Sequence, residues 1–147
     1  MSSPTVEILM VDDNRADQEL LREGLAAWVT ATRLTVVEDA DQALAYLRRD
    51  PPVSGAPRPE LVFLDWNLPR RDGGDFLEEM KNDDRLSSIP VIVMTTSSSE
   101  FDVRRAYRLH ANCYLTKPFD LEEYVGKVKA VEEFWLNNVT LPKPVPG

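Results

Sequence analysis

Short apolar runs alternate along this chain with stretches in which apolar residues recur at helical spacing. Five of the runs predict β-strands, at Val6–Val11, Leu34–Val37, Leu61–Leu64, Val91–Met94 and Cys113–Leu115. Most of these runs are apolar at every position, as is typical of strands that helices cover on both faces. Strands that alternate with helices form a parallel sheet. The pattern therefore predicts an α/β fold with five parallel strands and five helices.

Each predicted helix carries one apolar stripe that would face the sheet. In chain order the stripes are Leu20, Leu21, Leu25 and Trp28; Ala43, Leu44 and Leu47; Phe76, Leu77 and Met80; Val103 and Tyr107; and Leu121, Tyr124, Val125, Val128, Val131 and Trp135. The fourth helix should open with Ser99 and Asp102 as an acidic capping box, and the fifth should begin at Asp120. Asn112 is expected to supply the left-handed residue that ends the fourth helix.

Proline and glycine mark the segments that should be irregular. Residues 50–59 combine proline, glycine and serine without periodicity, which predicts a loop between the second helix and the third strand. The prolines in residues 141–147 exclude a helix there, because proline lacks an amide donor and clashes with the preceding turn. Since 147 residues suffice for one hydrophobic core, we expect one domain over residues 1–140 and an extended tail over residues 141–147.

Composition narrows the classes of function. The net charge of -8 and the sequence pI near 4.7 disfavour contact with the phosphate backbone of DNA or RNA. A single cysteine, Cys113, excludes an internal disulfide framework and is typical of a reducing compartment. The sequence contains neither a secretion signal nor an apolar run long enough to span a bilayer. These features predict a cytoplasmic protein that acts without nucleic acid or membrane.

The candidate chemistry lies at the ends of three predicted strands. Asp12 and Asp13 follow the first strand, Asp65 follows the third, and Lys117 follows the fifth. The carboxyl ends of parallel strands meet at one edge of the sheet, where such folds bind ligands. Acids and a lysine at this edge indicate a divalent cation and a phosphoryl group. Taken singly, each motif has a structural alternative, because Asp12-Asp13-Asn14 can cap a helix and Lys117 can be a solvated lysine.

Four motifs, in this order and spacing, resemble those of response regulator receiver domains. They are Asp12-Asp13, Asp65-Trp66-Asn67-Leu68-Pro69, Thr95 with Tyr114, and Lys117-Pro118, and the resemblance extends from about residue 6 to residue 135. It implies a flavodoxin-like, doubly wound fold with strand order 2-1-3-4-5, and a sensor histidine kinase as the source of a phosphoryl group for Asp65. The segments 89–97 and 109–118 and the run Glu132-Glu133-Phe134-Trp135-Leu136 resemble the single-domain regulators associated with phytochrome kinases.

Phosphoryl transfer to a carboxylate requires a cation, because the nucleophile and the phosphoryl group are both anionic. Mg²⁺ is the expected cofactor, since it prefers oxygen ligands in near-octahedral geometry. We expect Asp13, Asp65 and the backbone carbonyl of Asn67 to bind it directly. Asp12 should act mainly through water. Lys117 should place a positive charge on the far side of the phosphoryl group.

The resemblance also implies a switch formed by Thr95 and Tyr114. The hydroxyl of Thr95 would move to bond a phosphoryl oxygen, and the ring of Tyr114 would rotate into the space that it leaves. Phosphorylation would drive this change by binding the active arrangement better than the inactive one. Trp66, next to the acceptor, is expected to be a lid beside the metal. The alternative is a partly exposed aromatic residue that has no role.

No output domain is visible in the sequence, so protein partners are expected to carry the signal. Phe134 and Leu136 add apolar surface beyond what one helix face can bury. We expect a homodimer through the fourth helix, fifth strand and fifth helix, with Tyr124, Phe134 and Leu136 at the interface. The alternative is that the C-terminal segment folds back onto its own domain.

Three classes of function remain open at this point. The first is a phosphorylation-controlled signalling module that catalyses only its own phosphotransfer and dephosphorylation, and that either drives an output or drains phosphoryl groups from a kinase. The second is a Mg²⁺-dependent phosphohydrolase with an aspartyl-phosphate intermediate, although Asn67 occupies the position where such enzymes usually carry a second acid. The third is a receiver-shaped binding module that is never phosphorylated.

Overall fold

The strands of the sheet run parallel in the order β2-β1-β3-β4-β5. The computed structural model describes residues 5–49 and 58–142. The strands are β1 (Val6–Val11), β2 (Thr32–Val37), β3 (Leu61–Leu64), β4 (Val91–Thr95) and β5 (Cys113–Thr116). The five predicted strands and their order are therefore confirmed.

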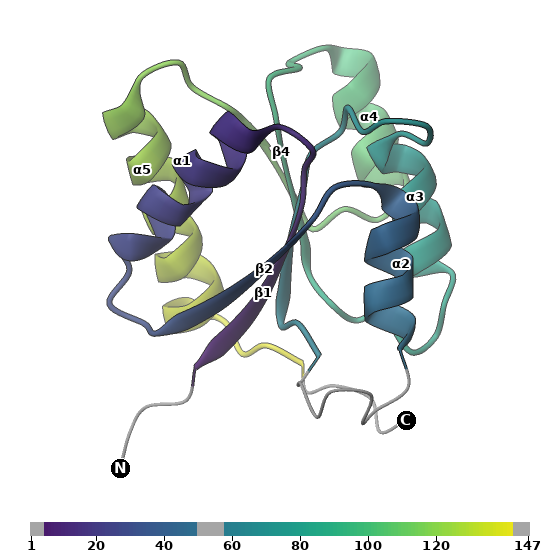
Figure 1. Cartoon of the computed structure of the whole chain (residues 1–147), viewed down its shortest axis with the longest axis horizontal. Coiled ribbons are helices and arrows are strands. Elements are labelled where there is room, and N and C mark those ends of the chain that lie inside the picture. The colour runs from purple at the N-terminus through teal and green to yellow at the C-terminus, as the bar shows by residue number, and fades with distance from the viewer. Residues whose placement is uncertain (1–4, 50–57, 143–147) are drawn as a thin grey trace.

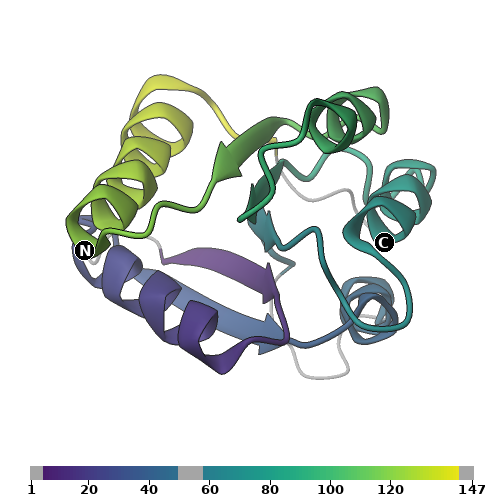
Figure 2. The same cartoon turned by 90° about the horizontal axis from the view of Figure 1, so that it is seen from above.

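Helices cover both faces of the sheet. They are α1 (Arg15–Ala26), α2 (Ala40–Arg48), α3 (Gly73–Lys81), α4 (Glu100–Arg108) and α5 (Leu121–Val131). Helices α1 and α5 lie on one face, and α2, α3 and α4 lie on the other (Figure 1, Figure 2). After α5 the chain continues as a π-helical segment, η1 (Glu132–Asn138). None of the described helices is long and apolar enough to cross a membrane.

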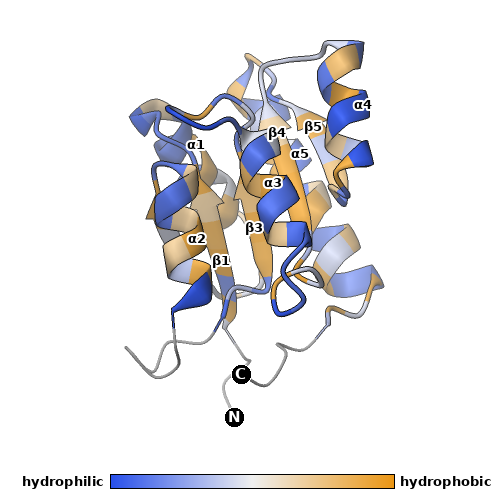
Figure 3. Cartoon of the chain, turned by 90° about the vertical axis from the view of Figure 1, so that its right-hand side faces the viewer, coloured by the Kyte–Doolittle hydropathy of each residue, from blue (hydrophilic) through white to orange (hydrophobic). Residues whose placement is uncertain are grey.

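The hydrophobic core has two layers, one on each face of the sheet. Leu9 and Val11 belong to the layer under α2, α3 and α4, whereas Ile8 and Met10 belong to the layer under α1 and α5. This division follows from the two-residue period of a strand. The strands are accordingly hydrophobic, and polar residues gather on the helices (Figure 3). Truncating one such buried leucine to alanine costs about 2–5 kcal/mol, so the two layers fix the strand ends firmly.

The register of the sheet brings the candidate residues to one edge. Val11 pairs with Val37 on one side and with Leu64 on the other, so Asp12 and Asp65 both stand one residue beyond the paired strands. The Asp65 amide donates to the Val11 carbonyl at 2.9 Å. Farther along the edge, the Lys117 amide donates to the Thr95 carbonyl at 2.7 Å. Backbone hydrogen bonds thus hold the site residues in place just past the ends of the strands.

The predicted starts of α4 and α5 are confirmed. The Ser99 hydroxyl accepts from the Asp102 amide at 3.1 Å, and the Asp120 carboxylate accepts from the Glu123 amide at 3.1 Å. A capping box would also have the Asp102 carboxylate accept from the Ser99 amide. Here that carboxylate accepts from the Ser97 hydroxyl at 2.6 Å, so this half of the prediction is wrong.

Helix α4 differs from the prediction along its apolar stripe. Tyr107 was expected to face inward, but this is wrong, since its side chain is 50% exposed. Ala106 is the residue of α4 that is fully buried. A helix that contacts the sheet through so small a side chain leaves its larger apolar residues, Phe101 among them, on the surface.

The end of α4 also corrects a prediction. His110, and not Asn112, has the left-handed backbone, with φ of 74°. The Ala111 amide donates to the Ala106 carbonyl at 2.9 Å and the His110 amide to the Tyr107 carbonyl at 3.0 Å, which is the Schellman arrangement. The Asn112 side chain instead accepts from the Val91 amide at 2.9 Å, so it ties the start of β5 to β4.

Most of the residues expected to be irregular lie outside the part of the chain that the structure describes. Residues 50–57 of the predicted loop and 143–147 of the predicted tail lie outside the described residues. Just before them, Leu141 packs against the core layer under α1 and α5. The division into a domain over residues 1–140 and a tail over residues 141–147 stays a prediction.

Candidate functional site

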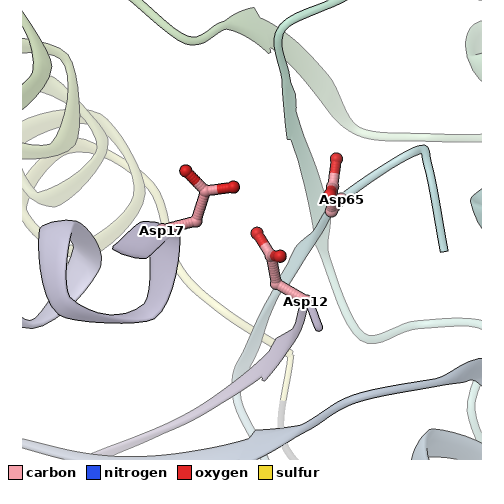
Figure 4. Close-up of side chains that lie close together, drawn as sticks. All are labelled: Asp12, Asp17 and Asp65. Carbon is pink, nitrogen blue, oxygen red and sulfur yellow. The ribbon is translucent and has the colours of Figure 1, made fainter. Parts of the chain in front are cut away.

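Three carboxylates face one another at the carboxyl edge of the sheet. Asp12 follows β1, Asp65 follows β3, and Asp17 lies in the first turn of α1 (Figure 4). One oxygen from each of the three lies within 4.8 Å of the others. Oxygen atoms this close form a hard-ligand set of the kind that divalent cations prefer. This group could therefore hold a metal ion.

Asp17 is the member of this group that the sequence reasoning missed. Its place is set by the cap of α1, where the Asn14 side chain accepts from the Asp17 amide at 3.0 Å. The Asn14 amide donates in turn to Asp12 at 2.9 Å. The structural interpretation of Asp12-Asp13-Asn14 as a cap is thus correct for Asn14, while Asp12 also belongs to the carboxylate group.

Lys117 lies among the same carboxylates. Its ammonium is 2.8 Å from Asp17, 3.1 Å from Asp12 and 3.9 Å from Asp65. The Lys117 side chain is 6% exposed, so the lysine is a buried partner of the acids and not the solvated residue of the alternative interpretation. Three carboxylates and one ammonium leave two negative charges among these four groups. A divalent cation would balance them.

Burial shapes the titration of the site. It raises the pKa of Asp12 to about 6, although the Asn14 amide and Lys117 act in the opposite direction. Burial likewise raises the pKa of Asp65, against the effects of Lys117 and of the Asn67 amide. For Lys117, burial alone would lower the pKa, but the hydrogen bond to Asp17 and the charges of Asp65 and Asp12 raise it overall. Lys117 therefore stays charged, while the two strand-end acids gain from a cation that offsets their burial.

The other expected metal ligands lie beside this group. Asp13 is exposed and does not belong to the close set of Asp12, Asp17 and Asp65. Asn67 is also exposed, and its amide is 3.4 Å from the Asp65 carboxylate. The direct roles of Asp13 and of the Asn67 carbonyl stay predictions.

The two expected switch residues occupy different environments. Thr95 is fully buried, and its hydroxyl makes no hydrogen bond of acceptable geometry to any described group. It lies close enough to Asp65 to lower the pKa of that carboxyl slightly. The Tyr114 hydroxyl donates to the Ser97 carbonyl at 2.8 Å, so the ring is tied to the loop after β4.

Tyr124 lies beneath the site. Its side chain is 1% exposed and lines a small cavity with Asp12, Asp65 and Lys117. Its hydroxyl has no hydrogen-bond partner among the described residues. The prediction that Tyr124 forms a dimer interface is wrong, because a side chain on the core-facing stripe of α5 cannot reach a partner.

The remaining interface candidates lie in η1. Phe134 is 52% exposed and contacts the Trp135 ring edge-on, with 5.3 Å between the ring centres. Leu136 is half-buried and packs against the core layer under α1 and α5. Phe134 is therefore accessible, whereas Leu136 already has a partner in its own domain.

Trp66 is a core residue, so it is neither the lid beside the metal that was expected nor the partly exposed residue of the alternative. It is 3% exposed and belongs to the core layer under α2, α3 and α4. The Arg105 guanidinium lies 5.5 Å from the centre of its ring and pairs with Asp72 at 3.0 Å. A side chain at Gly73 would come within 2.7 Å of the Asp65 carbonyl, so the chain turns tightly over the indole. Arg105 gave no sign in the sequence that it would reach the loop after Asp65.

Comparison with known proteins is consistent with this geometry. The family model for the response regulator receiver domain matches residues 8–129. Response regulator Rcp1 of Synechocystis sp. is 43% identical over 141 residues, which are 96% of this chain and 96% of that protein. The Mn²⁺-bound crystal structure of Rcp1 superposes with a TM-score of 0.84 at 42% identity, covering 95% of this chain and 99% of that one.

Two further solved structures are similar. The phosphorylated cyanobacterial phytochrome response regulator RcpA has a TM-score of 0.88 and 43% identity, covering 95% of this chain and all (100%) of that one. The receiver domain of the sensor histidine kinase PA1611 from Pseudomonas aeruginosa has a TM-score of 0.68 and 26% identity, covering 86% and 97% of the two chains. That receiver domain holds a magnesium ion in its active-site cleft.

Proposed function

The chain belongs to the response regulator receiver domain family, and from this premise we propose that Asp65 accepts a phosphoryl group from a sensor histidine kinase. The resemblance noted from the sequence motifs is thereby confirmed, and so is the flavodoxin-like fold. The place of Asp65 at the end of β3 carries this proposal. Its carboxylate lies 3.9 Å from the Lys117 ammonium and near the Thr95 hydroxyl, which has no hydrogen-bond partner among the described residues.

The chemistry assigned to Asp65 is nucleophilic attack on phosphorus. A carboxylate oxygen of Asp65 forms a bond to phosphorus as the bond from phosphorus to the histidine nitrogen of the kinase breaks, and the imidazole leaves. Burial raises the pKa of Asp65, but Lys117 keeps an ammonium 3.9 Å away and favours the ionised nucleophile. Activity of this kind is confined to the protein's own phosphotransfer and dephosphorylation.

The cation would be held by the acids at the sheet edge. Asp13, Asp65 and the carbonyl of Asn67 are proposed as direct ligands, with Asp12 acting through water. Mg²⁺ bound there would neutralise charge on the transferring group. The close set of carboxylates supports such an ion, because buried acids that repel one another bind a cation more readily than isolated ones.

The switch would begin at Thr95. A buried hydroxyl without a partner costs about 1–3 kcal/mol, and a phosphoryl oxygen on Asp65 would remove that cost. Movement of Thr95 toward Asp65 would open space for Tyr114, which would then give up its bond to the Ser97 carbonyl. The surface formed by α4, β5 and α5 would change with it. The free energy that a phosphoryl group gains from Thr95 is therefore available to drive the switch.

The proposed partners follow from the relatives. A histidine kinase, a phytochrome in particular, is proposed as the phosphoryl donor, because RcpA is a phytochrome response regulator. A homodimer is proposed through α4, β5 and α5, with exposed Phe134 extending the contact beside them and Leu136 at its border. No contact with nucleic acid or membrane is proposed, and the protein would meet its kinase in the cytoplasm.

Phosphorylation by a small donor tests the central claim. The protein is incubated with Mg²⁺ and acetyl phosphate, and its intact mass is recorded beside that of Asp65→Asn. We expect the wild type alone to gain one phosphoryl group. If Asp65→Asn gains the group as readily as the wild type, the acceptor is another residue. If the wild type gains none, the result favours the phosphorylation-independent binding module.

A further inference from the structure

The nearest partner of the buried lysine is not the proposed phosphoacceptor. The Lys117 ammonium lies 2.8 Å from Asp17 and 3.9 Å from Asp65, with Asp12 between them at 3.1 Å. Since Coulomb attraction and hydrogen bonding both weaken with distance, Lys117 is bound mainly by the first two acids. The ammonium therefore rests on the α1 side of the site.

The Asp17 carboxylate does not complete the cap of its helix. An acid at the third position of a helix usually reaches back to the amide of the N-cap residue. Here that amide, on Asn14, donates to Asp12 at 2.9 Å instead. The Asp17 carboxylate instead accepts from the Lys117 ammonium at 2.8 Å. Figure 4 shows Asp17 near the two strand-end acids, Asp12 and Asp65. Helix capping therefore does not account for the position of its side chain.

Lys117 and a divalent cation compete for the same acids. Asp12 and Asp65 are the strand-end carboxylates of the site, and each is also a partner of the ammonium. A lysine without any other partner would fall between these two acids and repel an incoming cation. With a third carboxylate on α1, the lysine keeps a close anionic partner while the other two acids turn to the metal.

We propose that Asp17 is a positioning residue, which holds Lys117 on the α1 side of the site so that Asp12 and Asp65 stay available to a divalent cation. This inference rests on the proposed function, and it adds a step to it. Lys117 leaves Asp17 when a phosphoryl group on Asp65 offers it more negative charge. Asp17 thus sets the resting place from which the lysine moves.

Metal affinity tests the inference without any phosphorylation. Binding of Mn²⁺ to the full chain is followed by electron paramagnetic resonance of the free ion, and Mg²⁺ is measured by competition. Asp17→Asn should weaken both ions by roughly 10- to 100-fold, the range seen when groups that orient metal ligands are lost. Asp17→Glu, which restores a carboxylate, should recover most of the affinity. Glu19→Gln removes an equal charge from an exposed position of α1 and should change the affinity by less than about twofold.

A double-mutant cycle separates action through the lysine from action on the metal itself. In a Lys117→Gln background no ammonium competes for Asp12 and Asp65, so Asp17→Asn should cost no more than about the twofold seen for the Glu19→Gln control. Circular dichroism checks that each variant is folded. An unchanged affinity in Asp17→Asn, or an equal loss with and without Lys117, would overturn the proposal. If the wild type binds Mn²⁺ but takes no phosphoryl group, the proposed function is refuted, whereas the effect of Asp17 on metal affinity still stands.

Discussion

Replacing Asp12 by asparagine should make the metal-free protein more stable at neutral pH. Asp12 is 1% exposed, and burial raises the pKa of its carboxyl to about 6. Asparagine keeps the shape of the side chain and removes the charge whose burial is costly. The expected stabilisation arises because the acid is placed for a cation and not for the fold.

The pH dependence follows from the direction of the shift. A raised pKa in the folded state means that folding favours the protonated acid. The contribution of Asp12 is therefore fully present below its unfolded value of 3.8, and it is lost as the pH rises through about 6. At about 1.4 kcal/mol for each pH unit, this amounts to about 3 kcal/mol between the two states. The difference between Asp12→Asn and wild type should grow by that order from pH 4 to pH 7.5.

Urea unfolding in the presence of a chelator measures this difference. The free energy of unfolding is determined for both proteins at several pH values between about 4 and 7.5. Other carboxylates, Asp72 and Glu79 among them, have lowered pKa values and lose stability in acid, but they do so equally in both proteins. Mg²⁺ should then stabilise the wild type more than the variant. Parallel pH profiles of the two proteins would refute the assignment of the raised pKa to Asp12.

Three other substitutions have defined outcomes. Tyr124→Phe should leave the free energy of unfolding unchanged or raise it by about 1 kcal/mol in urea titrations, because it removes a buried hydroxyl that has no partner among the described residues. A loss of about 2 kcal/mol would contradict this and reveal a hydrogen bond of that hydroxyl. Thr95→Val should change the free energy of unfolding by less than about 1 kcal/mol for the same reason. It should also abolish the phosphorylation-dependent change in hydrogen exchange of α4, and a variant that retains this change would contradict the role of Thr95 in the switch. Phe134→Ala should shift sedimentation from dimer toward monomer, with exposed Val29→Ala as the control, and an unchanged dimer would remove Phe134 from the interface.

The parts of the structure that follow a strict pattern were predictable. Mainly apolar runs identified β1, β3 and β4, and the acids and lysine at strand ends indicated which edge carries the site. Asp17 escaped notice because an acid in the first turn of a helix is ordinary, and only the fold brings it against Lys117.

Three of the wrong predictions have a common physical origin. Trp66, Tyr107 and Tyr124 are amphipathic side chains, and their place in a sequence pattern does not decide between a core and a surface position. Trp66 became buried because Arg105 and the turn at Gly73 close over it, while Tyr107 became exposed because Ala106 makes the close contact of α4. These outcomes depend on contacts between elements that are distant in the sequence.

Helix α4 is attached to the rest of the domain by charge as well as by hydrophobic burial. Ala106 is its fully buried residue, and Arg105 ties it to Asp72 and Asp75 at distances of 3.0 Å and 3.6 Å. Ion pairs weaken as salt screens them, whereas hydrophobic contacts do not. The ionic strength around the protein should therefore tune how tightly α4 is held, and the same phosphoryl group should produce a larger displacement of this helix in concentrated salt than in dilute buffer.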